Sequence, residues 1–144
     1  RVAMLRKAAK PHDRFEVLEM DDVSFSVNRT LPALERRFPD SELVFLFGSD
    51  ILPRLPDWPG AGRLLKTSEL VIGLRHQADR DEAHRLVEAW LVQPKALTMF
   101  ASYAPDVSSG RVREALRRRR PAKGLLASVE RYSDHNWLYV SVGD

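Results

Sequence analysis

Three short apolar runs dominate the hydrophobic pattern of the chain and predict β-strands. The clearest covers residues 42–50 (ELVFLFGSD), with five consecutive apolar residues over 43–47. Residues 69–75 (ELVIGLR) repeat this design, and residues 96–102 (ALTMFAS) are a weaker third copy. Continuous apolar runs of this length are typical of strands that are buried on both faces of a parallel sheet.

Between and around these runs, apolar residues recur at helical spacing. The stripe is clearest over residues 80–91, where Ala83, Leu86, Val87 and Trp90 share one face. The other helices that this spacing predicts cover 1–9, 30–38, 50–55, 60–65, 107–120 and 127–135.

Two further segments have the composition of strands. Residues 15–20 (FEVLEM) contain aromatic and β-branched residues in an alternating pattern that predicts a strand, and residues 137–142 predict a closing strand or extended segment. Strands that alternate with helices imply βαβ units. We therefore expect an α/β fold with a parallel sheet flanked by helices, in which the first βα unit is absent from the sequence.

Composition points to one water-soluble domain over residues 1–144. The chain has 44% hydrophobic and 30% charged residues of mixed sign, no stretch of the roughly 20 apolar residues that a membrane span requires, and no cysteine. Disulfides and thiolate metal sites are therefore excluded. We expect a cytoplasmic protein without a membrane partner, and the sequence leaves a homo-oligomer open.

The net charge of +3 comes largely from a basic run at residues 117–120, next to Arg111 and Arg113. Such a run is most often a solvated helix face, and otherwise a site for phosphates or nucleic acid. We expect the solvated face, with no nucleic-acid partner.

Candidate binding residues follow the predicted strands, because ligands of open parallel sheets bind beyond the carboxyl ends of the strands. Gly48, Ser49 and Asp50 follow the first run, and Arg75 follows the second. Gly48 allows a sharp turn, and Asp50 suits ribose hydroxyls or a metal-bound nucleotide; alternatively, Asp50 only caps the helix that it opens. Trp58, in a proline-rich loop, either stacks on a flat heterocycle or packs against the core.

Ser108 and Ser109 follow the third run and begin a helix that also carries Arg111 and Arg113. Hydroxyls and free N–H groups at a helix N-terminus form a phosphate site, and arginine adds charge-assisted contacts. The alternative is a plain helix cap, since serine is a common capping residue. The four histidines lack metal-ligand spacing, so we expect no zinc site and name no metal ligand. No Gly-x-Ser-x-Gly or Walker-type loop is present.

The order and spacing of these motifs resemble those of the nicotinate- and nicotinamide-mononucleotide adenylyltransferases. The resemblance extends from Arg1 to about Tyr139. The pieces that carry the resemblance are Gly48-Ser49-Asp50, Trp58, Arg75, Val107-Ser108-Ser109-Gly110-Arg111-Val112-Arg113 and His135-Asn136-Trp137-Leu138-Tyr139. The resemblance implies the Rossmann-like nucleotidyltransferase fold and adenylyl transfer from ATP to nicotinate mononucleotide, with Mg²⁺ bound with ATP. It also implies that Asp50 contacts a ribose, that Trp58 stacks on the pyridine ring, and that Ser108, Ser109 and Arg113 hold the ATP phosphates.

The sequence departs from the family pattern in two places. The family's catalytic His-x-Gly-His loop would precede Arg1, so the resemblance implies an inert chain with no catalytic residue of its own. Where the family often has Ser-Tyr-Thr, residues 24–28 read Ser-Phe-Ser-Val-Asn. The choice between nicotinate and nicotinamide substrates stays open, with the acid form preferred. The alternatives are a catalytically degenerate nucleotide-binding module and a sister enzyme such as a phosphopantetheine adenylyltransferase.

Overall fold

The computed structural model describes residues 1–20, 22, 24–103 and 106–139. Its contacts divide the chain into two compact units. Unit 1 consists of Arg1–Glu19 and Asp106–Asp144, and unit 2 is Met20–Pro105. The expectation of one domain over residues 1–144 stays a prediction.

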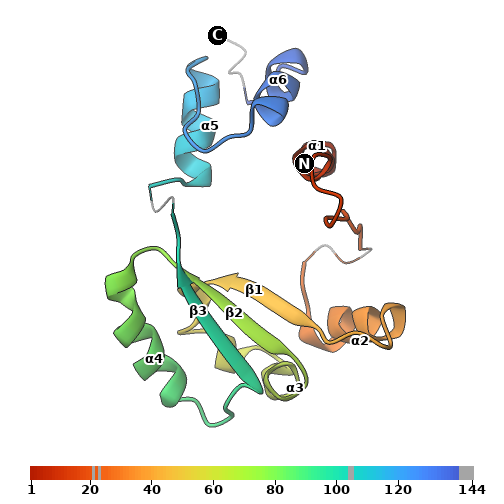
Figure 1. Ribbon diagram of the computed structural model, residues 1–144, viewed down its shortest axis with the longest axis vertical. Coiled ribbons are helices and arrows are strands. Elements are labelled where there is room, and N and C mark those ends of the chain that lie inside the picture. The colour runs from red at the N-terminus through yellow and green to blue at the C-terminus, as the bar shows by residue number, and fades with distance from the viewer. Residues whose placement is uncertain (21, 23, 104–105, 140–144) are drawn as a thin grey trace. The chain divides into compact units, whose positions relative to one another are not determined.

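Unit 2 is built on a sheet of three parallel strands in the order β1-β2-β3 (Figure 1). The strands are β1 (Val44–Gly48), β2 (Glu69–Leu74) and β3 (Ala96–Ala101). The connections contain the helices α3 (Ala61–Thr67) and α4 (Arg80–Glu88), and α2 (Val27–Arg37) precedes β1. The three apolar runs and the predicted βαβ pattern are therefore confirmed.

The core of unit 2 lies on one face of the sheet. Leu70, Ile72 and Leu74 of β2 are fully buried there, at about 1.5–3 kcal/mol of burial free energy each. Side chains of α2, α3 and α4 join the same cluster. Helix α4 ends at Glu88, three residues before the predicted end. Ala83 and Val87 of the predicted stripe are buried on it and Leu86 is half-buried, while Trp90 is buried two residues beyond the helix.

The prediction that the first apolar run is buried on both faces was wrong. Val44 and Leu46 are 54% and 65% exposed, whereas Phe45 and Phe47 on the opposite face pack against the core. In the described part of the chain β1 is an edge strand, and the helices of unit 2 add their buried side chains only to the face of Phe45 and Phe47. An apolar run shows that a strand is hydrophobic, but not what covers each face.

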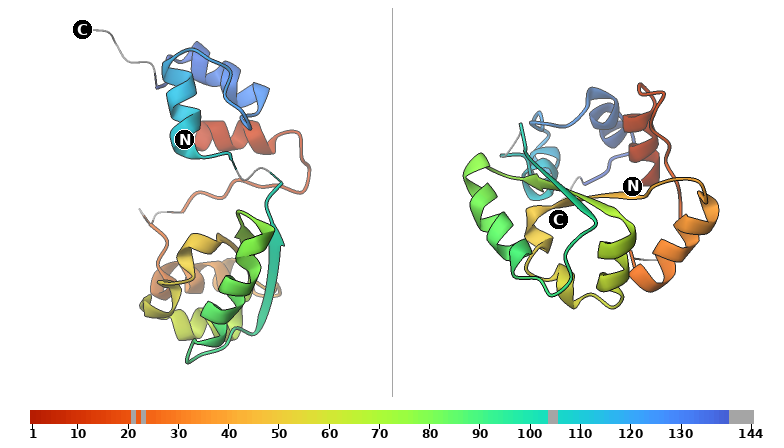
Figure 2. Two further views of the ribbon diagram at one scale, coloured as in Figure 1. Left: turned by 90° about the vertical axis from the view of Figure 1, so that its left-hand side faces the viewer. Right: turned by 60° about the horizontal axis from the view of Figure 1, so that its bottom comes forward.

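Unit 1 contains the helices α1 (Val2–Ala9), α5 (Ser109–Arg117) and α6 (Ala127–His135). Helices α1 and α6 contact each other and lie side by side (Figure 2). The bounds of α6 are as predicted. Helix α5 ends three residues before the predicted end, and Arg119 just beyond it adopts a left-handed φ of 51°.

Three local predictions were wrong. Residues 15–20 form no strand, and Phe15 is 66% exposed; alternation alone does not make a strand without a neighbour to complete its hydrogen bonds. Residues 50–55 are not one helix, because Pro53 and Pro56 lack the N–H groups that a longer helix needs. Instead, two short 3₁₀ helices occur, η1 (Ser49–Ile51) and η2 (Leu55–Asp57).

The third is the closing strand. Residues 137–139 form a turn in which Trp137 and Tyr139 have positive φ angles of 53° and 64°. Residues 140–142 lie outside the described residues. No helix among the described residues is long and apolar enough to cross a membrane.

Candidate functional site

The first group of candidate residues lies at the carboxyl edge of the sheet in unit 2. Gly48 ends β1 and pairs in register with Gly73, two residues before Arg75, which directly follows β2. Ser49 and Asp50 begin η1 at the same edge. Asp50 and Arg75 are both exposed. The structure thus brings a carboxylate and a guanidinium to the edge where ligands of parallel sheets bind.

Gly48 and Asp50 are in close contact. A Cβ built on Gly48 would lie 2.5 Å from Oδ1 of Asp50, so the Asp50 side chain folds back over the end of β1. The alternative that Asp50 caps a helix is not what the structure shows, because Gly48 is the N-cap of η1 and no side-chain cap hydrogen bond forms. Within the described residues the carboxylate also makes no ion pair.

Trp58 belongs to an aromatic cluster. Its ring lies 5.9 Å from that of Phe47, edge to face, and 6.2 Å from that of Phe25. Trp58 is half-buried and packs against the core, so the packing alternative describes part of its role. Stacking on a pyridine ring stays a prediction.

The segment that departs from the family pattern leads into α2. Ser26 is the N-cap of α2, and its side chain makes no cap hydrogen bond. Instead, Thr30 Oγ1 accepts from the Ser26 N–H at 3.0 Å and donates to Asp22 Oδ2 at 3.2 Å. Phe25, 39% exposed, contacts Phe45, Phe47 and Trp58. Phe25 was not among the site residues predicted from the sequence; the signal for it was an aromatic residue directly before a helix cap.

The second group of candidates lies at the start of α5 in unit 1. Ser108 is the N-cap, and its Oγ accepts from the Arg111 N–H at 3.2 Å, so the capping alternative is realised for this hydroxyl. Arg113 Nε donates to the Ser109 carbonyl at 3.1 Å, and an Arg111 guanidinium N–H donates to the Asp106 carbonyl at 3.3 Å. The backbone N–H groups of Ser109 and Gly110 have no partner within the helix and can meet a ligand at this end.

A cavity of about 840 Å³ opens beside this helix start. Ser108, Ser109 and Arg113 line it, together with Arg1, Tyr139 and apolar residues of α1, α5 and α6; Arg111 does not line it. Gly124 holds the α5–α6 loop close to the site, with a φ of 82° and with Val107 side-chain carbons 2.6 Å and 3.0 Å from where a Cβ would be. The structure thus joins three of the four predicted phosphate-binding residues in one cavity.

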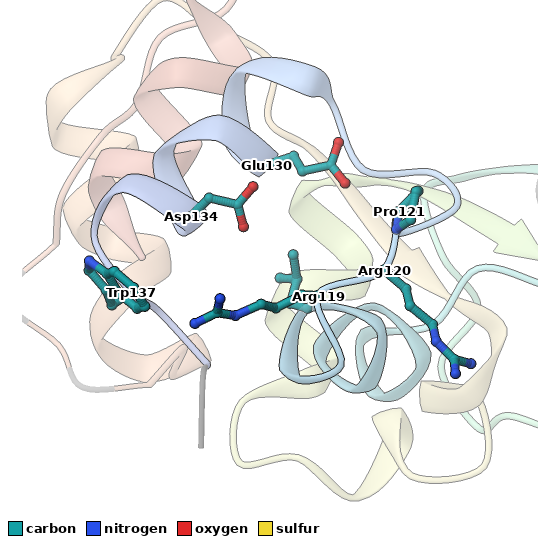
Figure 3. A pocket seen from close by; sticks show the side chains of 7 residues that line it. Arg119, Arg120, Pro121, Glu130, Asp134 and Trp137 are labelled. Atoms are coloured by element: carbon teal, nitrogen blue, oxygen red, sulfur yellow. The ribbon is translucent and has the colours of Figure 1, made fainter. Parts of the chain in front are cut away.

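Three of the four arginines in the basic run, which begins at the last residue of α5, contact neighbouring side chains. Arg118 forms an ion pair with Glu114 at 2.7 Å, and Arg117 lies 3.9 Å from the same carboxylate. Figure 3 shows Arg119 extended toward Trp137, whose ring centroid is 5.1 Å from the guanidinium, while Arg120 extends away. All four arginines are exposed, as predicted, but only Arg117 lies on the helix, because α5 ends there.

At the opposite, amino-terminal edge of the sheet, Glu42 and Lys95 form an ion pair at 2.8 Å. The hydrogen bond and charge of Lys95 lower the pKa of Glu42, and the same contact raises the pKa of Lys95. Residues 42 and 95 precede β1 and β3, so this pair lies away from the candidate site. In the described part of the chain, no three His, Cys, Asp or Glu side chains are grouped to hold a metal ion.

Comparison with solved structures defines the fold. A Plasmodium falciparum nicotinic acid mononucleotide adenylyltransferase complexed with APC matches with a TM-score of 0.62 at 15% identity, over 87% of this chain and 63% of that one. The chain thus spans less than two thirds of that structure. The match confirms the predicted Rossmann-like α/β fold of the nucleotidyltransferases.

Sequence relatives identify the family, although no protein-family model matches the chain. A Gemmatimonas aurantiaca protein named "Probable nicotinate-nucleotide adenylyltransferase" is 31% identical over 96% of this chain and 67% of that protein. A Bacillus pumilus protein of the same name is 31% identical over 98% of this chain and 71% of that protein. The chain belongs to the nicotinate-nucleotide adenylyltransferase family.

Proposed function

We propose that the protein transfers the adenylyl group of ATP to nicotinate mononucleotide, giving deamido-NAD and pyrophosphate. The observation that carries the proposal is the cavity at the start of α5, where Ser108, Ser109 and Arg113 converge. The family supports the reaction, and so do two solved Plasmodium falciparum relatives of the same fold, one complexed with APC and the other with NaAD.

In this proposal the α5 cavity holds the ATP phosphates. The N–H groups of Ser109 and Gly110 are in the first turn of a helix, where the helix dipole favours an anion. Arg113 adds a guanidinium that can contact phosphate oxygens, once its Nε leaves the Ser109 carbonyl. Ser109 supplies a hydroxyl that is not engaged as the N-cap, in contrast to Ser108.

The carboxyl edge of the sheet holds the mononucleotide in the same proposal. Asp50 is exposed and accepts hydrogen bonds from ribose hydroxyls, and Arg75 contacts the phosphate. Trp58 stacks one face of its ring on the pyridine, and the edge-to-face contact with Phe47 fixes the orientation of the Trp58 ring. For the pyridine substituent, the Ser26 hydroxyl, which makes no cap hydrogen bond, and the α2 N-terminus favour a carboxylate over an amide.

Adenylyl transfer depends on the positioning of the two substrates and on positive charge near the phosphates more than on a covalent intermediate with the protein. The mononucleotide phosphate oxygen attacks the α-phosphorus of ATP, the bond to the bridging oxygen breaks, and pyrophosphate leaves. Arg113 and the α5 N-terminus would stabilise charge on the leaving group. Mg²⁺ would arrive bound to ATP, and it then needs few protein ligands because phosphates and water complete its coordination. A cytoplasmic location, where ATP is supplied, is part of the same proposal.

Two alternatives have their own readouts. A degenerate module that kept the α5 cavity would bind ATP without releasing pyrophosphate. A sister adenylyltransferase would release pyrophosphate with phosphopantetheine and not with a pyridine mononucleotide; the aromatic cluster of Phe25, Phe47 and Trp58 favours the flat pyridine substrate.

The test is pyrophosphate release by the protein purified from its natural source. MgATP is supplied with nicotinate mononucleotide, with nicotinamide mononucleotide, or with phosphopantetheine, and the dinucleotide is detected by mass spectrometry. We expect turnover with the nicotinate substrate, and less with the amide. ATP binding without any turnover, or turnover with phosphopantetheine alone, would show the proposal to be wrong.

A further inference from the structure

Helices α1 and α6 of unit 1 form a groove that is lined by basic side chains and by no carboxylate. The groove has a volume of about 390 Å³ and is lined by Lys7, Ser128, Arg131, Tyr132 and His135. It shares no lining residue with the α5 cavity. The candidate site in unit 1 therefore does not account for it.

The spacing along α6 explains why the groove is basic. Residues 128, 131, 132 and 135 are three, four and seven positions apart, so they share one face of the helix. The two carboxylates of α6 nearest to them, Glu130 and Asp134, line a different cavity with Arg119 and Trp137 (Figure 3). Helix α6 thus separates its negative and positive side chains onto two faces.

Contacts between the two helices hold the groove together. The Ser128 hydroxyl donates to the Lys7 carbonyl at 3.5 Å, and the Lys7 ammonium lies 5.1 Å from the centroid of the Tyr132 ring. This cation–π contact places the ammonium at α6, where it adds to the charge of Arg131. Among the described residues, Lys7, Arg131 and His135 form no ion pair with a carboxylate.

We infer that this groove binds the phosphate groups of a small anion, at a site separate from the α5 cavity. An ammonium, a guanidinium, an imidazole N–H and the Tyr132 hydroxyl supply donors from two helices, and no carboxylate lines the groove to repel an anion. Charge-assisted hydrogen bonds from such donors are the usual means of binding phosphate oxygens. Free pyrophosphate and the phosphates of a nucleotide share this chemistry.

The inference is tested by following backbone amide signals in ¹H–¹⁵N NMR spectra while sodium pyrophosphate is added at constant ionic strength. We expect saturable shifts for Lys7, Ser128, Arg131 and His135. The substitution Arg131→Gln should raise the apparent dissociation constant for pyrophosphate about tenfold, because one charge-assisted hydrogen bond is lost. The matched control is Arg85→Gln, an exposed arginine on α4 of unit 2, which should leave the constant unchanged.

A further variant separates this groove from the α5 cavity. In Arg113→Gln, signals of Ser108 and Ser109 should respond less to pyrophosphate, while the α6 signals keep their response. Shifts of the α6 signals that never saturate, or that weaken equally in Arg131→Gln and Arg85→Gln, would overturn the inference, because they would show only general screening of surface charge.

Titration with ATP and with adenosine distinguishes the two sources of the anion. If the α6 signals saturate at a lower concentration of ATP than of pyrophosphate, a nucleotide is the ligand. If they saturate at an equal or higher concentration of ATP, the free anion is the ligand. A response to adenosine without any response to pyrophosphate would contradict phosphate recognition.

Discussion

The Asp50 side chain occupies the space beside Gly48 in which any larger residue would place its Cβ, 2.5 Å from Oδ1. The strand end and the proposed ribose-binding carboxylate are therefore coupled. The clashing atom is the far end of a side chain and not backbone, so a new Cβ would move the carboxylate more readily than it would unfold the strand.

This relationship predicts a selective effect of Gly48→Ala. We expect the KM for the mononucleotide to rise about tenfold, because the displaced carboxylate loses a charge-assisted hydrogen bond to the ribose. The free energy of unfolding should change by less than about 1 kcal/mol. Kinetics and urea denaturation measure the two effects. The control is Gly62→Ala on α3, where a Cβ would meet only Val92 at 3.9 Å; an equal rise in KM there would contradict the coupling.

The two serines at the start of α5 should have different roles, Ser108 in the stability of the helix and Ser109 in ATP binding. Ser108→Ala removes the N-cap hydrogen bond to the Arg111 N–H and should cost about 1 kcal/mol of stability. Ser109→Ala removes no cap, so it should weaken ATP binding with little change in stability. Thermal unfolding and calorimetric ATP titration of both variants check this. A larger stability loss in Ser109→Ala would mean that the capping assignment is wrong.

Trp58 should show both a packing and a binding role. Trp58→Ala loses the contacts with Phe47 and Phe25, and since the ring is half-buried we expect a loss of about 1–2 kcal/mol. Trp58→Phe keeps an aromatic face and should retain most of the stability. If the ring also stacks on pyridine, Trp58→Phe should still raise the KM for the mononucleotide while the KM for ATP stays constant; an unchanged KM leaves packing as its role.

The Glu42–Lys95 pair predicts a pH effect at the far edge of the sheet. Because Lys95 lowers the pKa of Glu42, the pair contributes stability above the ordinary value of 4.5, and this contribution is lost as pH falls through the lowered pKa. Both side chains are exposed, so the effect on stability is small. In Lys95→Ala the pKa of Glu42, measured from its side-chain ¹³C shift, should return toward 4.5. Lys66→Ala is the control and should leave it low.

Much of the fold was predictable because local patterns are strong here. The three strands, the α4 stripe and the bounds of α6 follow from apolar runs and helical spacing, which need only neighbouring residues to be read. The motif order likewise indicated the family that relatives at 31% identity confirm. The failures have different causes. Residues 15–20 look like a strand, yet among the described residues no neighbouring strand completes their hydrogen bonds. Residues 50–55 fail as one helix for a local reason, the two prolines.

The candidate site divides in the same way. The sequence by itself determined which residue types stand at strand ends and helix starts, because those positions follow from where each run stops. Only the tertiary structure decided that Arg113 lines a cavity and Arg111 does not, that Phe25 joins the ring of Trp58, and that α6 turns a basic face toward Lys7. These outcomes depend on side chains far apart in the chain that meet only when helices and strands pack, and no local pattern contains that information.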